Sequence, residues 1–335
     1  MPTNPNHKPL SPSPQTSSPL VFSPAYNTDL PAFGLNKPFA LDRGELVLAA
    51  LQKELTALPA VLNPQPLQWA DLSLVHTPDY LQSLAHEETW LEIFELKKSD
   101  LNLATAVKKL PQLIDDFMLK SGGTLLAARQ ALNLGLAANL GGGYHHAHHD
   151  HGSGYCVIND TAIAIRKLQN EKLIEKALII DLDFHQGDGN AAIFAQDETV
   201  FTFSVHSQEG WPEAKRESDL DVGILEADKA TYLERTRDGI ETAFSRIEPD
   251  LVMFIAGSDP YEKDVLPGTK FLRLPLSTMQ ARDEYVIDAC KKRNVPMVMV
   301  FAGGYGPHVW EVHHKAVRHL LTTSGFTQKN SPQPI

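Results

Sequence analysis

Carboxylate and imidazole side chains that could bind a metal ion follow one short apolar run of the chain. Asp181, Asp183 and His185 come directly after Leu178-Ile179-Ile180 and are spaced two residues apart. Because residues two apart in an extended chain point to the same side, all three side chains could face one pocket. Mixed oxygen and nitrogen ligands suit zinc or another divalent first-row ion. Short aspartate-rich runs after strands also form helix caps and turns, so this segment alone leaves both interpretations open.

Two further aspartates follow a second apolar run, Leu251 to Ile255. These are Asp259 and Asp264, five residues apart. A catalytic metal keeps three protein ligands and an open position for water or substrate. A carboxylate from a neighbouring strand end would complete that set, which favours the metal interpretation of the first segment.

Several of the 14 histidines crowd into the segment from Gly141 to His151. Adjacent imidazoles suit proton transfer near neutral pH, and glycines let the backbone approach a ligand closely. His145 and His146 directly follow Gly-Gly-Gly-Tyr144 and are the stronger candidates. An aspartate such as Asp181 or Asp188 could accept a hydrogen bond from the far ring nitrogen of each histidine and so fix its tautomer.

The other histidines of this kind lack such a context. We interpret His148, His149 and His151 as part of a solvated loop or a nonspecific metal-binding tract. His313 and His314 lie in the helical pattern from Glu311 to Leu320, and we expect them on a solvated helix face.

Tyr305 lies in the glycine-rich segment Ala302 to Gly306, which follows a third apolar run. A tyrosine on such a turn is usually a packing residue whose hydroxyl is satisfied. Beside a metal, however, its phenol could donate a hydrogen bond to a developing oxyanion.

The elements that must position these residues alternate along the chain. Four apolar runs indicate buried strands: 178–180, 200–203, 251–255 and 296–301. Helical patterns cover 123–134, 159–169, 228–247, 277–293 and 311–320. The alternation predicts an α/β fold with a mostly parallel central sheet and helices on both faces. Because ligands of such sheets bind beyond the carboxyl ends of the strands, the polar residues after these four runs should converge on one site.

Composition limits the classes of function. The net charge is -11, from 41 acidic and 30 basic side chains, which disfavours direct binding of nucleic acids or anionic membrane surfaces. The two cysteines cannot form a disulfide framework, and no apolar stretch approaches the length of a membrane span. We therefore expect a cytoplasmic protein, and the sequence carries no signal for its oligomeric state.

The polar, Pro/Ser-rich residues 1–19 and the polar residues 324–335 are typical of disordered tails. No internal repeat or long linker divides the chain between them, so one catalytic domain over 20–323 is the simplest interpretation.

The motifs described above, in their order along the chain, resemble the zinc-dependent histone deacetylase superfamily. The resemblance rests on Gly-Gly-Gly-Tyr-His145-His146, Gly154-Tyr155-Cys156, Asp181-Leu-Asp183-Phe-His185-Gln-Gly-Asp188, Ala-Gly-Ser-Asp259 with Asp264, and Gly-Gly-Tyr305. The class IV branch and its bacterial relatives are the most similar. The resemblance implies a single-domain, three-layer fold of the arginase/deacetylase type.

The resemblance also implies a role for each matching residue. Asp183, His185 and Asp264 match the ligands of one catalytic Zn²⁺ ion. His145 and His146 match a tandem acid/base pair supported by Asp181 and Asp188, and Tyr305 matches an oxyanion donor. Substrate-binding positions are Gly154, Tyr155, Trp211 and Gly303, with Trp211 as a second tunnel wall. A monovalent cation, K⁺, would lie near Asp181, Asp183, His185, Ser204 and Val205.

We therefore hypothesise that the protein is an amidohydrolase that removes acetyl or longer acyl groups from lysine side chains of proteins or peptides. An acylated polyamine is an alternative substrate, and a non-catalytic acyl-lysine binding module is a further alternative. An arginase-type ureohydrolase would need Asp-x-His-x-Asp, and Gly187 occupies the position of its second carboxylate.

Overall fold

The structure is a computed structural model that describes residues 17–326. Most of the two predicted tails, residues 1–16 and 327–335, lies outside the described residues. Ser18 is buried, and its backbone N–H donates to Gln130 Oε1 at 3.1 Å. The described chain therefore packs against the rest of the molecule two residues before the first strand begins.

The strands form one sheet in which every pair of neighbours is parallel, so the prediction of a mostly parallel sheet is confirmed. Their order across the sheet is β2-β1-β3-β8-β7-β4-β5-β6. The strands are β1 (Leu20–Val21), β2 (Val61–Leu62), β3 (Leu136–Asn139), β4 (Ala177–Asp181), β5 (Val200–Ser207), β6 (Leu220–Ile224), β7 (Leu251–Ile255) and β8 (Met297–Val300).

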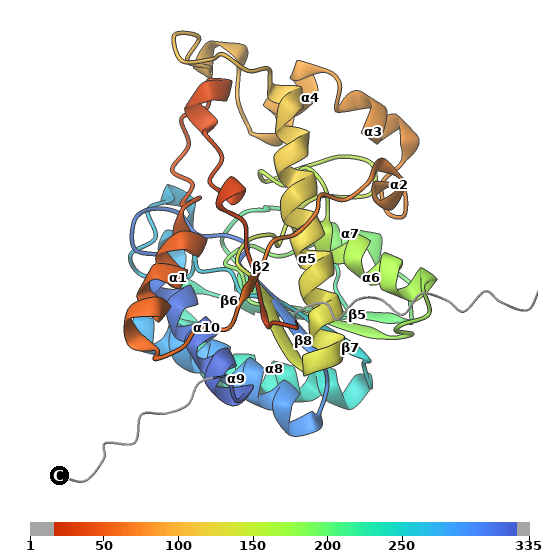
Figure 1. Cartoon of the computed structure of the whole chain (residues 1–335), viewed down its shortest axis with the longest axis vertical. Coiled ribbons are helices and arrows are strands. Elements are labelled where there is room, and N and C mark those ends of the chain that lie inside the picture. The colour runs from red at the N-terminus through yellow and green to blue at the C-terminus, as the bar shows by residue number, and fades with distance from the viewer. Residues whose placement is uncertain (1–16, 327–335) are drawn as a thin grey trace, which may run out of the picture.

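Helices cover both faces of the sheet, which gives the predicted three layers (Figure 1). Along β4, Leu178 and Ile180 pack into one core and Ile179 into the other, as the alternation of a strand requires. One face is covered by α5 (Ile114–Leu134), α6 (Asp160–Asn170) and α7 (Asp188–Ile193). The other face is covered by α1 (Arg43–Glu54), α8 (Tyr232–Arg246), α9 (Leu276–Arg293) and α10 (Trp310–Thr323).

A third apolar cluster lies beyond the sheet, where the short helices gather over the N-terminal half of α5 (Figure 1). Trp90 and Phe117 belong to it and are buried. The short helices are α2 (Trp69–Leu72), α3 (Pro78–Ser83) and α4 (Glu87–Ile93). The 3-10 helices are Pro24–Tyr26, Leu30–Phe33, Lys98–Asp100, Leu110–Leu113, Glu226–Thr231 and Pro267–Phe271.

A buried arginine on α9 ties together the segments that follow two central strands. The Arg282 guanidinium donates to the carbonyl oxygens of Leu182 (2.7 Å) and Gly257 (3.0 Å), just after β4 and β7. Its Nε donates to Asp283 at 2.7 Å, and both side chains are fully buried. Because one guanidinium binds both carbonyl oxygens and the Asp283 carboxylate, Arg282 fixes the distance between the segments that follow β4 and β7.

We expect Arg282→Met to lower the free energy of unfolding by about 3–5 kcal/mol, because it leaves Asp283 as an uncompensated buried charge. Arg293→Met, at the partly exposed pair with Glu241, should cost less than about 1 kcal/mol. Urea unfolding of both variants measures the difference. Equal stability of the two variants would contradict this role of Arg282.

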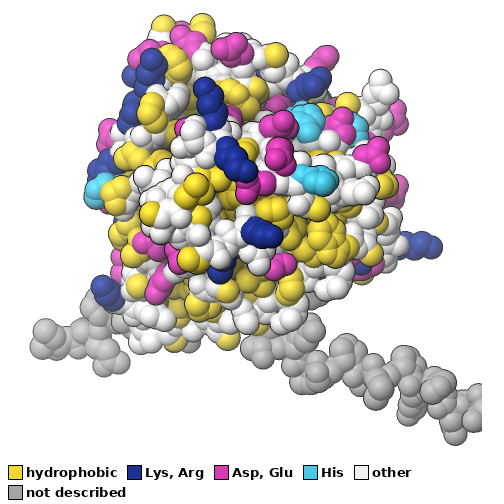
Figure 2. Space-filling view, turned by 90° about the horizontal axis from the view of Figure 1, so that it is seen from above, with side chains coloured by type: hydrophobic (Ala, Val, Ile, Leu, Met, Phe, Trp, Pro, Cys, Tyr) yellow, Lys and Arg dark blue, Asp and Glu magenta, His cyan; other side chains and the backbone are white. Residues whose placement is uncertain are grey.

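In the part of the chain that the structure describes, no helix is both long and apolar enough to cross a membrane. Figure 2 views the molecule from above. On that face, Lys and Arg side chains are scattered among acidic, histidine and apolar ones and do not gather into one large patch.

Candidate active site

Three buried side chains at the carboxyl edge of the sheet lie close enough to hold one metal ion. One ligand atom each from Asp183, His185 and Asp259 lies within 4.8 Å of the others. His185 Nδ1 is 3.2 Å from Asp183 Oδ1 and 3.0 Å from Asp259 Oδ2. The Gly303 N–H donates to Asp183 Oδ2 at 2.8 Å, and a Cβ at this glycine would lie 2.5 Å from an oxygen of each carboxylate. Any side chain at position 303 would collide with the two aspartates, so only glycine fits at this point of the loop that follows β8.

Asp264, which the resemblance selects as the third ligand, lies outside this group of three. Its Oδ1 accepts from the Leu266 N–H and the Thr269 hydroxyl, both at 2.9 Å, and its Oδ2 accepts from the Tyr305 N–H at 2.7 Å. An ionised carboxylate offers about four acceptor positions, so Oδ2 keeps one. Burial raises the pKa of Asp264 to about 6.

The electrostatics of the group of three fit a cation. Asp259 Oδ1 accepts from the Phe184 N–H at 2.9 Å, and its buried Oδ2 lies 3.0 Å from His185 Nδ1. Burial and the Asp183 charge raise the pKa of Asp259 to about 7. Burial opposes a charge on His185, but Asp183 and Asp259 outweigh it and raise its pKa to about 10. Two buried carboxylates that lie this close together repel each other, and a cation that binds between them relieves the repulsion.

Two histidine–aspartate pairs lie beside this group. His145 Nδ1 is 2.7 Å from Asp181 Oδ2, and His146 Nδ1 is 2.7 Å from Asp188 Oδ1. The two imidazole rings are 3.9 Å apart between centroids, and all four side chains are buried. Each carboxylate holds the proton on Nδ1, which leaves Nε2 as the nitrogen free to act on a ligand.

The two imidazoles have opposite pKa shifts. Burial disfavours charge on both rings, but Asp181 and Asp183 raise the pKa of His145 to about 9. Burial and the neighbouring His145 charge lower the pKa of His146 to about 4. At neutral pH, His145 is therefore the cation and His146 the neutral base. The first can stabilise negative charge while the second accepts a proton.

The expectation of a solvated His148 is wrong, because this side chain is buried and its Nε2 lies 3.2 Å from Asp188 Oδ2. His149 and His151 are exposed, as expected. Of His148, His149 and His151, it is therefore His148 that contacts the second histidine–aspartate pair, through Asp188.

The expectation of a solvated helix face at His313 and His314 is also wrong, because both are buried. His313 Nε2 donates to the carbonyl oxygens of Ala256 (2.9 Å) and Phe301 (3.1 Å), and its ring stacks on Phe301. The Nε2 of His313 thus bonds to the backbone that follows β7 and β8, a contact that no local pattern encodes.

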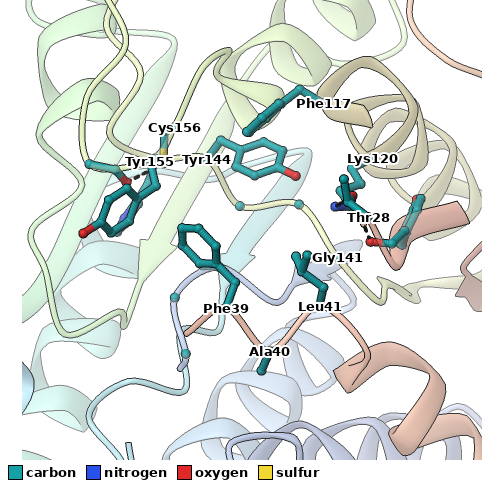
Figure 3. Close-up of a pocket in the computed structure, with 18 of the residues that line it drawn as sticks. Thr28, Phe39, Ala40, Leu41, Phe117, Lys120, Gly141, Tyr144, Tyr155 and Cys156 are labelled. Carbon is teal, nitrogen blue, oxygen red and sulfur yellow. Dashed lines mark hydrogen bonds between the residues drawn. The ribbon is translucent and has the colours of Figure 1, made fainter. Parts of the chain in front are cut away.

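Tyr305 opens onto a cavity of about 130 Å³ that also contacts His145, His146, Asp183 and His185. In Figure 3, Tyr155, Phe39 and Tyr144 lie around one part of this cavity, and Lys120 with Thr28 lies at another. The Tyr305 ring packs against Phe39, and its hydroxyl has no hydrogen bond to the described residues. Burial and two nearby carboxylates raise its pKa well above the usual value, so the phenol remains a donor.

Three of the four predicted substrate-binding residues line this cavity, namely Gly154, Tyr155 and Gly303. Gly154 has φ +50°, and a Cβ there would lie 2.9 Å from the Trp211 ring. Trp211 packs edge-on against His146 at 4.7 Å between centroids but does not line the cavity. Tyr155 lines the cavity, and its hydroxyl lies 3.5 Å from Lys37 Nζ. Gly154 thus allows the indole to approach the second histidine of the pair.

Arg43 and Phe39 belong to the site but were not predicted. Arg43, the first residue of α1, donates to the carbonyl oxygens of Ala302 and Gly303. Phe39 forms an isolated bridge with Tyr305. These contacts hold the tyrosine turn from segments about 260 residues away, so only the tertiary structure shows them.

The residues predicted to hold a monovalent cation lie together at the neighbouring strand end. Ser204 pairs in register with Asp181, and Val205 follows it on β5. Both are buried. The cation itself stays a prediction.

Comparisons with known proteins agree with this architecture. The family model for the histone deacetylase domain matches residues 37–321. An uncharacterized protein of Picosynechococcus is 36% identical over 305 residues, 90% of this chain and 96% of that protein. Histone deacetylase 2 of Arabidopsis thaliana is 29% identical over 293 residues, 85% of this chain and 74% of that protein. The fold is similar to that of an acetylpolyamine aminohydrolase from Burkholderia pseudomallei, with a TM-score of 0.66 at 19% identity over 91% of this chain and 98% of that chain. The chain therefore belongs to the histone deacetylase family of amide hydrolases.

Proposed function

We propose that this protein is a zinc-dependent deacylase that hydrolyses the amide bond of acyl-lysine side chains. The observation that carries the proposal is the convergence of a metal-capable group, two histidine–aspartate pairs and a tyrosine hydroxyl around one cavity. The free, buried cysteines and the negative net charge support a cytoplasmic enzyme that does not bind nucleic acids directly.

The donor set fits zinc, which accepts imidazole nitrogen and carboxylate oxygen in one site. Asp183 and His185 would hold the ion, and Asp264 would supply Oδ2. Asp259 lies beside them, with its Oδ2 3.0 Å from His185 Nδ1. A bound zinc ion would polarise the acyl carbonyl and lower the pKa of a water molecule. A K⁺ ion at the Asp181 to His185 segment and Ser204-Val205 is part of the same proposal.

His146 is the proposed general base, because it is neutral and Asp188 directs its Nε2 away from the carboxylate. After accepting a proton, the same ring can donate it to the leaving lysine amine. His145, held in its charged form by Asp181, would stabilise negative charge that develops on the substrate. Tyr305 would donate to the oxyanion. Gly154, Tyr155 and Gly303 line the cavity that would receive the acyl-lysine chain, and Trp211 would form a wall outside it, beside Gly154.

The pH dependence should reflect the depressed pKa of His146. A base with a lowered pKa is competent above that value, so kcat/KM should hold down to about pH 5 and fall as the pH nears 4. Measuring kcat/KM from pH 4 to 8, with metal content followed in parallel, checks this. Half-loss near pH 6.5 at constant metal content would show that His146 titrates as an ordinary histidine.

The size of the cavity favours short acyl groups. Its volume of about 130 Å³ resembles the roughly 150 Å³ of an engineered protein cavity that holds benzene. We therefore expect acetyl-lysine peptides to react faster than octanoyl-lysine peptides, and octanoyl faster than myristoyl.

Rates on these three peptides and on acetylspermidine test the proposed function. Turnover of acetylspermidine alone would establish the polyamine alternative, and binding of peptide without turnover would establish a non-catalytic module. A myristoyl peptide that reacts fastest would contradict the volume argument.

A further inference from the structure

One carboxylate is shared by two histidines that lie two residues apart. Asp188 Oδ1 is 2.7 Å from His146 Nδ1, and Asp188 Oδ2 is 3.2 Å from His148 Nε2. All three side chains are buried, with His148 only 4% exposed. Asp188 therefore lies between the proposed general base and a second imidazole outside the reaction cavity.

The fold fixes the position of His148 from both sides of its backbone. Its N–H donates to the His151 carbonyl at 2.9 Å, and its own carbonyl accepts from His76 Nδ1 at 2.9 Å. The His76 Nε2 accepts from the Asn159 N–H at 3.0 Å, which places the His76 proton on Nδ1. The ring of His148 also stacks on that of His151 at 4.3 Å. The side chain of His149, the next residue, is more than half exposed and lies beside Asp150 instead of Asp188.

Several ionisable groups face this pair from the elements packed against it. They are His146, His151 and Asp150 on the same loop, His76 before α3, Cys156, and Lys215, whose ammonium interacts with the Asp188 charge. Among the described residues, His148 is the side chain besides His146 that donates to the Asp188 carboxylate.

We propose that His148 is a positioning residue that acts on His146 through Asp188. This inference rests on the proposed role of His146 in proton transfer. By donating to Oδ2, His148 holds the carboxylate so that Oδ1 faces His146, and it disperses part of the negative charge that His146 meets. The general base thus depends on a hydrogen bond formed outside the cavity.

The sign of the effect follows from this arrangement. Removing the donor on Oδ2 concentrates charge on the carboxylate, which then stabilises protonated His146 more strongly. The same sign holds whether His148 is neutral or charged, because both forms donate from Nε2. Loss of His148 should therefore move the acid limb of kcat/KM to higher pH.

His148→Leu, His148→Gln and His149→Leu, each loaded with zinc, test the inference by their pH profiles. The free energy of a hydrogen bond to a charged group is similar to that of a shift of one pKa unit. We therefore expect His148→Leu to move the acid limb of kcat/KM to higher pH by about 1 unit. A glutamine side-chain amide can donate to Oδ2, so His148→Gln should restore the wild-type profile, and His149→Leu should match it. A His148→Leu profile that superimposes on wild type, or that falls uniformly without a shift, would overturn the inference.

A second readout does not depend on turnover. The hydrogen-bonded Nδ1 proton of His146 should give a slowly exchanging ring resonance in the spectrum of ¹⁵N-histidine-labelled protein. His148→Leu should shift this resonance, and His149→Leu should not. If wild-type protein hydrolyses no acyl-amine but the shift occurs, the proposed function fails and the positioning contact stands. If the resonance does not respond to His148→Leu, the inference fails whatever the activity.

Discussion

Tyr305→Phe should lower kcat by about 100-fold to 1,000-fold, the usual cost of removing one oxyanion donor. Its ring packs against Phe39 in a turn that Arg43 holds, and its hydroxyl has no hydrogen bond to the described residues. Phenylalanine keeps the packing and removes only the donor. Steady-state kinetics on an acetyl-lysine peptide, together with metal analysis, measure the effect.

Tyr155→Phe is the matched control, because it removes a hydroxyl that lines the same cavity but faces Lys37. We expect its kcat to change little. Near wild-type activity in Tyr305→Phe would contradict the assignment of the donor, and an equal loss in both variants would indicate general damage to the cavity.

Asp183→Ala and Asp264→Ala should each weaken zinc binding by more than about 100-fold, the upper end of what substitutions in the outer shell of a metal site cost. Asp183 belongs to the group of three, and Asp264 Oδ2 retains an acceptor position beside the Tyr305 N–H. Zinc titration with a competing chromophoric chelator measures the affinities, and activity should fall with occupancy.

Asp150→Ala, which removes an exposed carboxylate, should bind zinc as wild type does. Asp259→Asn tests whether Asp259 or Asp264 is the third ligand. Asparagine keeps the acceptor for the Phe184 N–H and removes the carboxylate charge at Oδ2. Full zinc occupancy in both Asp183→Ala and Asp264→Ala would show that the ligands are misassigned.

The sequence predicts four strands of the sheet, and the candidate metal ligands and Tyr305 lie just after the ends of these strands. β4, β7 and β8 are buried along their whole length and, apart from Asp181, are apolar, and β5 begins with the mainly apolar run Val-Phe-Thr-Phe. Sequence alone can detect such runs. The strands β1 and β2 are two residues long, and β3 reads Leu-Ala-Ala-Asn without a β-branched residue. β6 lies at the edge and is partly exposed. These four strands depend on tertiary pairing, so no local pattern predicts them.

The histidine interpretation failed for a related reason. The loop context of His148 and the polar helical pattern around His313 favour solvent exposure. Their burial instead depends on Asp188 and on two backbone carbonyls far along the chain. Spacing predicts that His145, His146, Asp181 and Asp183 lie close together, and the structure brings them together because each lies next to a buried strand or a glycine turn. Arg43 reaches the site from a separate helix and leaves no motif.

The most direct test of the account is turnover of an acetyl-lysine peptide by the purified protein before and after metal removal. We expect hydrolysis in the zinc-loaded protein, loss of hydrolysis after a chelator strips the ion, and recovery when zinc is restored. Recovery should fail in Asp183→Ala, whose ligand group is incomplete. Hydrolysis that persists at full rate in the metal-free protein would contradict the proposed mechanism.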